Sequence, residues 1–425
     1  MVVSAHGNAF VSTLARLKKN RSFRRAYLLD LPSFSQKWWY GGETPVVLYK
    51  RKIKTKDFTG VNPISNIYIF WEVFVMDVFQ VANYKEYLFD TAKTIFGIDS
   101  PSGYYHAVVK EVEKIATGLG YKFEQIEKGC GIITIDGEDN SKTVMLSAHV
   151  DTLGLMVRSI TSDGNLKFTK VGGPIMPTLD GEYCRIHTRD GRVYTGTIIS
   201  ESPAVHVHPD ASTRTRDEDN MIVRIDEQVH NKEDVLNLGI QVGDYICYDP
   251  KTVVTESGFL KSRFIDDKGS VACLLTALKI MKEQGLKPQY KTKFFISVFE
   301  EVGHGAAYIP SDVSEILAVD MGCIGLDLTC TEYDVSICAK DSGGPYDYDM
   351  TSKLIELAKE NGLKYAVDIY PRYGSDVGAA LHGGHNIKGG LIGPGVHASH
   401  GMERTHYSAL ENSINLILLY LGCKK

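Results

Sequence analysis

The chain has 425 residues, of which 43% are hydrophobic and 23% are charged. This length is ample for a large buried core, and it suggests two domains or one domain that carries an insertion. The formal net charge of −5 gives no support to a nucleic-acid partner, because such a protein would favour a strongly basic face. No apolar run approaches the roughly 18 residues of a membrane-spanning helix, so we expect no membrane partner.

The eight cysteines are scattered along the chain and form no CxxC pair. This pattern predicts neither a disulfide framework nor a cysteine zinc site. Free thiols are typical of a reducing compartment, so we expect a cytoplasmic protein.

The N-terminal part lacks the patterning of the rest of the chain. From Met1 to Leu29 six residues are Lys or Arg and none is acidic, which superficially resembles a transit peptide. The stretch that follows mixes aromatic residues and glycines without a sustained period. We therefore interpret residues 1–83 as an N-terminal extension. We expect residues 1–75 to be either poorly ordered or not part of the natural protein, and in the second case Met76 would be the true first residue.

Regular structure is predicted from Tyr84 onward. Two amphipathic helices come first, and two short apolar strands follow, an order that is typical of an α/β domain. These elements span residues 85–98, 107–118, 131–135 and 143–150. The same pattern resumes after residue 262 with a helix, two strands and two further helices, at residues 268–284, 291–299, 316–322, 351–361 and 409–420.

The segment between these two parts differs in kind. It consists of short alternating runs separated by turns such as Asp163-Gly164 and Asp190-Gly191, and it shows no long helical pattern. We predict a small all-β domain over residues 158–262. It is inserted into one α/β domain formed by residues 84–157 and 263–425.

A histidine and an aspartate stand at the end of one predicted strand. His149 closes an apolar strand, at the end where open α/β sheets place their ligand sites. Asp151 lies two residues on, so its side chain leaves the strand on the same side and can fix the imidazole tautomer of a metal-bound histidine. Alternatively, His149 is an ordinary histidine at a strand end, whose ring makes hydrogen bonds and binds no metal.

Two pairs of adjacent acids follow later in the chain. Asp266 and Asp267 precede a helix, where they could cap its N-terminus, although an aspartate can also bridge two cations. Glu300 and Glu301 follow the buried strand at 291–299. Two carboxylates there would repel each other unless one binds a metal or takes a proton, which allows one ligand and one general base. The alternative for this pair is an exposed position in a loop.

The last candidates are Asp320, after another apolar strand, and one of the three histidines in the segment HASHGMERTH, which are His397, His400 and His406. The combination of these residues predicts a site, because all these strand ends would converge on one edge of a sheet. Nitrogen and oxygen ligands without thiolate suit zinc, cobalt or manganese. Five side chains that share one aspartate supply three ligands to each of two metals and leave positions open for water and substrate. These five are His149, Asp266, Glu301, Asp320 and His400.

At these residues the chain resembles peptidase family M42, the metallo-aminopeptidases, from about Tyr84 to Lys425. The resemblance rests on seven motifs in the family's order: SPSGY (100–104), AHVDTLGLMV (148–157), RFIDDKGS (263–270), FEEVGHGAA (299–307), AVDMG (318–322), YGSDVGAAL (373–381) and ASHGMERTH (398–406). It implies the α/β/α sandwich of zinc peptidases with an inserted, barrel-like β domain.

The resemblance also implies a metal set for this chain. His149, Asp266 and Asp320 would bind one divalent ion, and Asp266, Glu301 and His400 would bind the other. Zinc or cobalt is the expected metal. Family members commonly form hollow dodecamers through the inserted domain, so the resemblance implies a homo-oligomer.

In the activity that the resemblance implies, N-terminal residues are removed from peptide substrates. A water that bridges the two metals would attack the scissile carbonyl. Glu300 would act as general base and then as acid, and Asp151 would orient the first metal-binding histidine.

The chain departs from the family pattern at three places. Thr152 follows the HxD motif where many members have an acid, VGHGAA is about one residue shorter than the common form, and HGMERTH replaces HSP followed by an acid. These departures concern substrate preference and the choice of His400 over His397. The alternative functions are an N-acyl amino-acid deacylase of the M20 type, a glycosidase and a non-catalytic relative.

Overall fold

The computed structural model describes residues 46–50, 71–75 and 79–424. The chain divides into two compact units, Met1–Met76 and Asp77–Lys425. In the first unit, strands β1 (Val46–Lys50) and β2 (Trp71–Val75) pair antiparallel. The second unit begins with the short 3-10 helix η3 (Val81–Tyr84). The predictions for an N-terminal extension and for a start at Met76 otherwise concern residues outside the described part of the chain.

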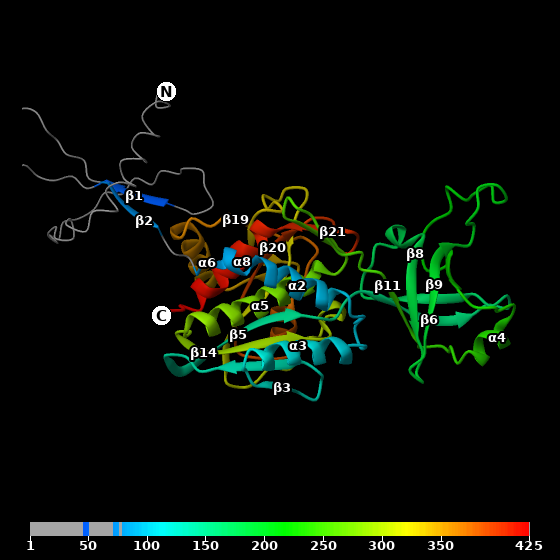
Figure 1. The fold of residues 1–425 in the computed structure, drawn as a ribbon, viewed down its shortest axis with the longest axis horizontal. Helices are drawn as coiled ribbons and strands as arrows, with labels where there is room; N and C mark the ends of the chain where they lie inside the picture. The colour runs from blue at the N-terminus through cyan, green and yellow to red at the C-terminus, as the bar shows by residue number, and fades with distance from the viewer. Residues whose placement is uncertain (1–45, 51–70, 76–78, 425) are drawn as a thin grey trace, which may run out of the picture. The chain divides into compact units, whose positions relative to one another are not determined.

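A ten-stranded mixed sheet forms the centre of the second unit (Figure 1). Its strands run in the order β18-β17-β20-β15-β5-β14-β4-β3, with β16 beside β20 and β19 beside β17. They are β3 (Phe123–Gln125), β4 (Gly131–Ile135), β5 (Asp139–His149), β14 (Tyr290–Ser297), β15 (Val313–Val319), β16 (Gly322–Cys323), β17 (Val335–Asp341), β18 (Gly344–Pro345), β19 (Tyr365–Ile369) and β20 (Lys388–Val396). The four neighbours β20, β15, β5 and β14 are parallel, so their carboxyl ends meet at one edge, as the sequence predicts.

Helices cover both faces of this sheet. They are α2 (Lys85–Phe96), α3 (His106–Gly118), α5 (Ile265–Gln284), α6 (Tyr348–Glu360), α7 (Asp376–His382) and α8 (Tyr407–Tyr420). Successive residues of a strand face opposite sides, and on β20 Gly389 faces Val377 of α7 while Gly390 faces Met350 of α6. The fold is therefore the predicted α/β/α sandwich.

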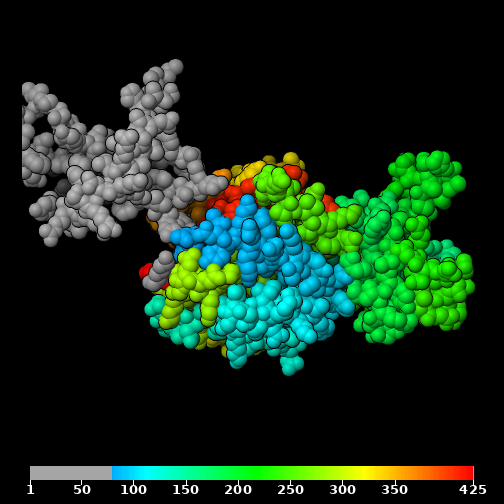
Figure 2. Space-filling view, in the orientation of Figure 1, coloured from blue at the N-terminus to red at the C-terminus, as the bar shows by residue number. Residues whose placement is uncertain are grey.

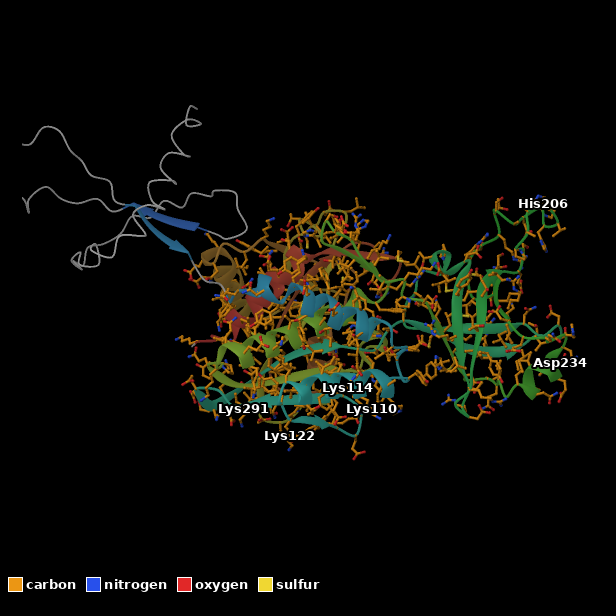
Figure 3. The ribbon with its side chains drawn as sticks, in the orientation of Figure 1. Lys110, Lys114, Lys122, His206, Asp234 and Lys291 are labelled. Atoms are coloured by element: carbon orange, nitrogen blue, oxygen red, sulfur yellow. The ribbon has the colours of Figure 1, made fainter. Side chains whose placement is uncertain are left out.

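The most buried helix is α5, which packs against α2, α8 and strand β5. Its segment from Val271 to Leu278 is completely buried, so it is apolar on every side rather than amphipathic. The blue and cyan helices α2 and α3 lie at the surface in Figure 2. On α3, Lys110 and Lys114 point outward (Figure 3), while Val108 and Val112 face the core.

The inserted domain is a closed six-stranded barrel in the order β10-β7-β6-β11-β8-β9 (Figure 1, green). Its elements are β6 (Gly154–Ile160), β7 (Leu166–Val171), β8 (Glu182–His187), β9 (Val193–Ser200), β10 (Met221–Ile225), β11 (Tyr245–Tyr248) and the short helix α4 (Lys232–Asn237). It has its own core, in which Leu155, Phe168, Ile186 and Val223 are fully buried. The predicted β domain is thus a barrel.

The barrel strands do not coincide with the predicted range of residues 158–262. The first strand begins at Gly154, only five residues after His149. At the other end, β12 (Val253–Val254) and β13 (Phe259–Ser262) form a separate sheet with β21 (Glu403–His406). The difference arises because alternation along a strand shows that one face is buried but does not identify the strand's partner.

The connection from β9 to β10 is the long surface loop of the barrel. It carries His206, which Figure 3 shows at its outer end, between Val205 and Val207 with exposed fractions of 71% and 72%. All eight cysteines are free. No helix in the described part of the chain is long and apolar enough to cross a membrane.

A charged contact fastens the barrel to the sandwich. Asp99 follows α2 in the chain, and it accepts two hydrogen bonds of 2.7 Å from the guanidinium of Arg185 on β8. His187 of the same strand places Nε2 at 2.8 Å from Asp99. Burial raises the pKa of Asp99, but the hydrogen bonds from Arg185 and His187 outweigh this and lower the pKa to about 2.

We expect Asp99→Asn to lower the free energy of unfolding by about 2 kcal/mol at pH 7, because hydrogen bonds to a charged group are lost. Since the folded-state pKa of Asp99 is depressed, its contribution is present above pH 4 and is lost as the pH falls toward 2. The difference from wild type should therefore shrink between pH 5 and pH 2 in urea unfolding experiments.

The matched control for this experiment is Asp219→Asn, which removes an exposed barrel aspartate 3.3 Å from Arg158. It should cost less than about 0.5 kcal/mol, because exposed ion pairs contribute little. Equal losses in the two variants would contradict the role of Asp99.

Candidate functional site

Six histidine and carboxylate side chains gather at the carboxyl edge of the four parallel strands. Their positions follow directly from the sheet order, because each strand brings its own residue to this edge. They are His149 at the end of β5, Glu300 and Glu301 in the 3-10 turn η5 (Glu300–Val302) after β14, Asp320 directly after β15, His400 in the loop after β20, and Asp266 in the first turn of α5.

His149 is 1% exposed, and its ring is oriented by hydrogen bonding. Its Nδ1 lies 2.8 Å from the backbone carbonyl of Asp151, which can only accept, so Nδ1 carries the proton. The Nε2 lone pair therefore points into the cluster. It lies 3.3 Å from Asp266 Oδ1 and 3.7 Å from Glu300 Oε2, and it has no hydrogen-bond partner among the described residues.

The carboxylate of Asp151 lies farther from His149 than its carbonyl does, with Oδ1 at 3.5 Å from Nδ1. It accepts a 2.5 Å hydrogen bond from the hydroxyl of Ser102, and it also accepts the backbone N–H groups of Glu300 and Glu301 at 3.1 and 3.3 Å. The side chain thus ties the end of β5 to the glutamate pair. The sequence predicted an orienting role for this side chain, and the structure shows the carbonyl as the nearer acceptor.

Asp266 lies between the two histidines of the cluster. Its Oδ1 is 3.3 Å from His149 Nε2, and its Oδ2 is 3.5 Å from His400 Nε2. Burial raises the pKa of Asp266, but the two neighbouring imidazoles outweigh it and hold the pKa well below its usual value. Asp266 and Asp267 have non-helical backbone angles, and no side chain caps α5, so the helix-cap alternative does not describe this pair. Asp267 accepts the backbone N–H of His149 at 3.1 Å.

His400 is the histidine of the HASHGMERTH segment that reaches the cluster. Its Nε2 lies 3.7 Å from Glu301 Oε2. His397 is exposed and its backbone pairs with Arg404. His406 caps the N-terminus of α8 by accepting the backbone N–H of Ser408.

The inserted barrel contacts His400 directly. Nδ1 of His400 lies 3.0 Å from the carbonyl of Gly173, and Ile175 donates its N–H to the carbonyl of His400 at 3.1 Å. Both residues follow barrel strand β7. Gly172 has φ +73°, and a Cβ there would lie 2.6 Å from Leu153 Cδ2, so only glycine fits this close approach.

The ligand atoms form two overlapping groups. Those of His149, Glu300 and Asp320 lie within 4.8 Å of one another, and so do those of His149, Asp266 and Glu301. A third such group in the described part of the chain is Asp99, His187 and Cys247. There the guanidinium of Arg185 already neutralises Asp99, so a cation would be repelled.

The charges of the cluster are unbalanced without a cation. Burial, with nearby carboxylates adding to it, raises the pKa values of Glu300 and Glu301 well above their usual range and that of Asp320 to about 7. Burial opposes the charged form of His400, but its hydrogen bond to Asp266 raises its pKa to about 10. His149 Nε2 and Glu301 Oε1 are both buried and unpaired among the described residues. Divalent ions would satisfy these atoms, and a set of nitrogen and oxygen donors without sulfur fits zinc or cobalt.

Sequence reasoning assigned no role to three further buried acids and hydroxyls. Asp376 accepts the N–H of Ala306 at 2.9 Å, and burial raises its pKa to about 6. Glu403 accepts the N–H of Asp266, and Ser102 donates to the site as described above. All three lie within the motifs YGSDVGAAL, ASHGMERTH and SPSGY, and this position in a motif is the one feature of the sequence that could have identified them.

Comparisons with known proteins agree with this fold. The sequence model of the family described as M42 glutamyl aminopeptidase matches residues 129–416. The protein YhfE of Bacillus subtilis strain 168 is 44% identical over 330 residues, which cover 77% of this chain and 95% of that protein.

Two solved structures have the same fold. Aminopeptidase APDkam598 from the archaeon Desulfurococcus kamchatkensis aligns with a TM-score of 0.71 at 22% identity, covering 79% of this chain and 94% of that one. The Pyrococcus horikoshii TET1 peptidase aligns with a TM-score of 0.68 at 23% identity, covering 78% and 98%. The family match includes every residue of the cluster from His149 to His400. On this evidence the chain belongs to the M42 glutamyl aminopeptidase family of peptidases.

Proposed function

We propose that the protein is a metal-dependent aminopeptidase that holds two divalent ions and removes N-terminal residues from peptides. The observation that carries the proposal is the position of Asp266, whose two oxygens lie 3.3 and 3.5 Å from the Nε2 atoms of His149 and His400. A carboxylate between two imidazole nitrogens is the arrangement that a bridging ligand of two metals requires.

In this proposal His149, Asp266 and Asp320 hold one ion, and Asp266, Glu301 and His400 hold the other. When bound, two such ions, zinc or cobalt, supply Lewis-acid polarisation of the scissile carbonyl and lower the pKa of water. Three protein ligands per metal leave positions free for substrate, which is the pattern of catalytic rather than structural sites.

Glu300 is the proton carrier of the proposed reaction. Its side chain is 16% exposed, and its backbone N–H is held at 3.1 Å by Asp151 Oδ1. Burial raises its pKa well above that of an ordinary glutamate, which favours a carboxylate able to take a proton near neutral pH. It would take a proton from water and deliver it to the leaving amine.

We also infer a homo-oligomer and a cytoplasmic location. The Pyrococcus horikoshii TET1 peptidase, which shares this fold, can assemble into a tetrahedron or a large octahedral shell. The same fold with an inserted barrel supports an assembly built through that barrel, with a dodecamer as the expected form. The eight free cysteines favour a reducing compartment.

The first test is Glu300→Gln. The variant keeps the shape of the side chain but cannot accept a proton, so kcat on aminoacyl-anilides should fall by about 100- to 10,000-fold. Metal content should stay at two ions per chain. Unchanged kcat would contradict the assignment of the base, and hydrolysis of N-acetylated anilides alone would replace the aminopeptidase by a deacylase.

A second test separates the candidate histidines. His400→Ala should leave about one tightly bound metal per chain after dialysis, because it removes one of three ligands of the second ion. His397→Ala is the matched control and should retain two, since His397 is exposed. Elemental analysis measures both, and the reverse result would assign the second ion to His397.

A third test uses proton release. In the metal-free protein His400, with a pKa of about 10, holds a proton at pH 7, and the raised pKa values of Glu300 and Glu301 favour their protonated forms. Metal binding must displace protons from its ligands, so the apparent affinity should rise as the pH rises from about 5 to 8. Calorimetry in two buffers of different ionisation enthalpy measures the protons released. Identical heats in the two buffers would contradict the ligand set.

A further inference from the structure

Glu403 is a buried carboxylate next to the cluster, and it contacts the main chain of two cluster residues. It is the first residue of β21 and is 2% exposed. Strand pairing places it, because Glu403 lies opposite Ser262 in the ladder between β21 and β13. Ser262 is four residues before Asp266, so this short sheet joins the start of α5 to the loop that carries His400.

Each oxygen of Glu403 accepts one backbone N–H. Oε2 accepts the N–H of Asp266 at 3.0 Å, and Oε1 accepts the N–H of His400 at 3.0 Å. One carboxylate therefore holds the main chain of both residues. Their side chains approach each other at 3.5 Å, from Asp266 Oδ2 to His400 Nε2.

Both main-chain segments need such support. His400 has φ +63° and Ala398 has φ +59°, which is the left-handed region where a non-glycine residue costs about 1 kcal/mol. Asp266 has φ −74° and ψ 104°, outside the helical region, although α5 continues beyond it. A buried N–H without an acceptor would add a penalty at either position.

We propose that Glu403 is a positioning residue that sets the separation of Asp266 and His400 and thereby the affinity for the ion that these residues share with Glu301. This inference rests on the proposed two-metal function. Glu403 does not ligate the ion. It acts through the two backbone amides, as groups behind metal ligands commonly do.

The variant that tests this role is Glu403→Gln. Glutamine has the same shape, but one carboxylate oxygen becomes an NH2 group, which faces an N–H and cannot accept from it. Whichever way the amide turns, either Asp266 or His400 loses its acceptor. We expect the second ion to bind about 10- to 100-fold more weakly, the usual effect of removing a partner behind a metal ligand.

The matched control is Asp368→Asn in β19. Asp368 is 6% exposed, and its two oxygens accept the backbone N–H groups of Thr329 at 2.8 Å and Cys330 at 2.9 Å. The substitution makes the same chemical change in an equally buried carboxylate that holds no residue of the cluster. It therefore measures the structural cost alone.

The experiment is a cobalt titration of the full-length, metal-free chain, followed by visible absorption and by bound cobalt per chain. Wild type and Asp368→Asn should bind two equivalents with similar affinity. Glu403→Gln should bind the first equivalent and require about 10- to 100-fold more cobalt for the second. Excess cobalt should restore its kcat, which a purely structural lesion would not allow.

The titrations distinguish a failure of the positioning role from a failure of the proposed two-metal function. If Glu403→Gln titrates like wild type, or if Asp368→Asn shifts equally, the positioning role is overturned while the two-metal function stands. If wild type itself binds fewer than two cobalt ions, the proposed function fails and this inference fails with it. Should Glu403→Gln not fold, Glu403→Asp keeps the charge but shortens the side chain by one methylene. Glu403→Asp should also bind the second cobalt ion more weakly than wild type. A titration curve identical to that of wild type would overturn the positioning role.

Discussion

This fold buries many negatively charged side chains at one edge of its central sheet. Four parallel strands deliver His149, Glu301, Asp320 and His400 to that edge, and α5 adds Asp266. Carboxylates that are this close in a poorly solvated place repel one another unless protons or cations lie between them. Backbone groups stabilise one of the nearby negative charges, because the N–H groups of Glu300 and Glu301 donate to the carboxylate of Asp151. The cluster is therefore a preformed arrangement whose raised pKa values favour protons on its carboxylates when no cation is bound.

The sequence predicted the convergence of these residues because parallel strands have a fixed direction. Apolar runs that end in an acid or histidine, with helices between them, leave few other arrangements. The choice of a histidine within HASHGMERTH was harder, since spacing alone does not show that His400 adopts a left-handed backbone while His397 enters a strand pair. His400 was predicted over His397 because of the resemblance to family M42.

Other parts of the site could not be predicted for a physical reason. Glu403 and Asp376 act by accepting backbone N–H groups of distant segments, and any residue except proline offers such a group. No residue pattern identifies these contacts before the fold is known. The same reason explains the shifted limits of the barrel, where β12 and β13 alternate like barrel strands but pair with β21. For Asp151, the sequence predicted a carboxylate that orients His149, and only the structure shows that the nearer acceptor is the backbone carbonyl.

Two of the contacts between the barrel and the sandwich differ chemically. At Asp99 the contact is a pair of charges that fixes β8 against the end of α2. At His400 the contact is with the backbone of Gly173 and Ile175, which sets the rotation of the imidazole about its own axis. A displacement of the barrel would act on that ring through hydrogen bonds, whereas His149 is held by the carbonyl of Asp151, in the short connection from β5 to the first barrel strand. The two halves of the site are thus tied to the inserted domain in different ways, one by hydrogen bonds and the other through the chain itself. Any force applied to the barrel by a neighbouring molecule would be felt by the two halves unequally.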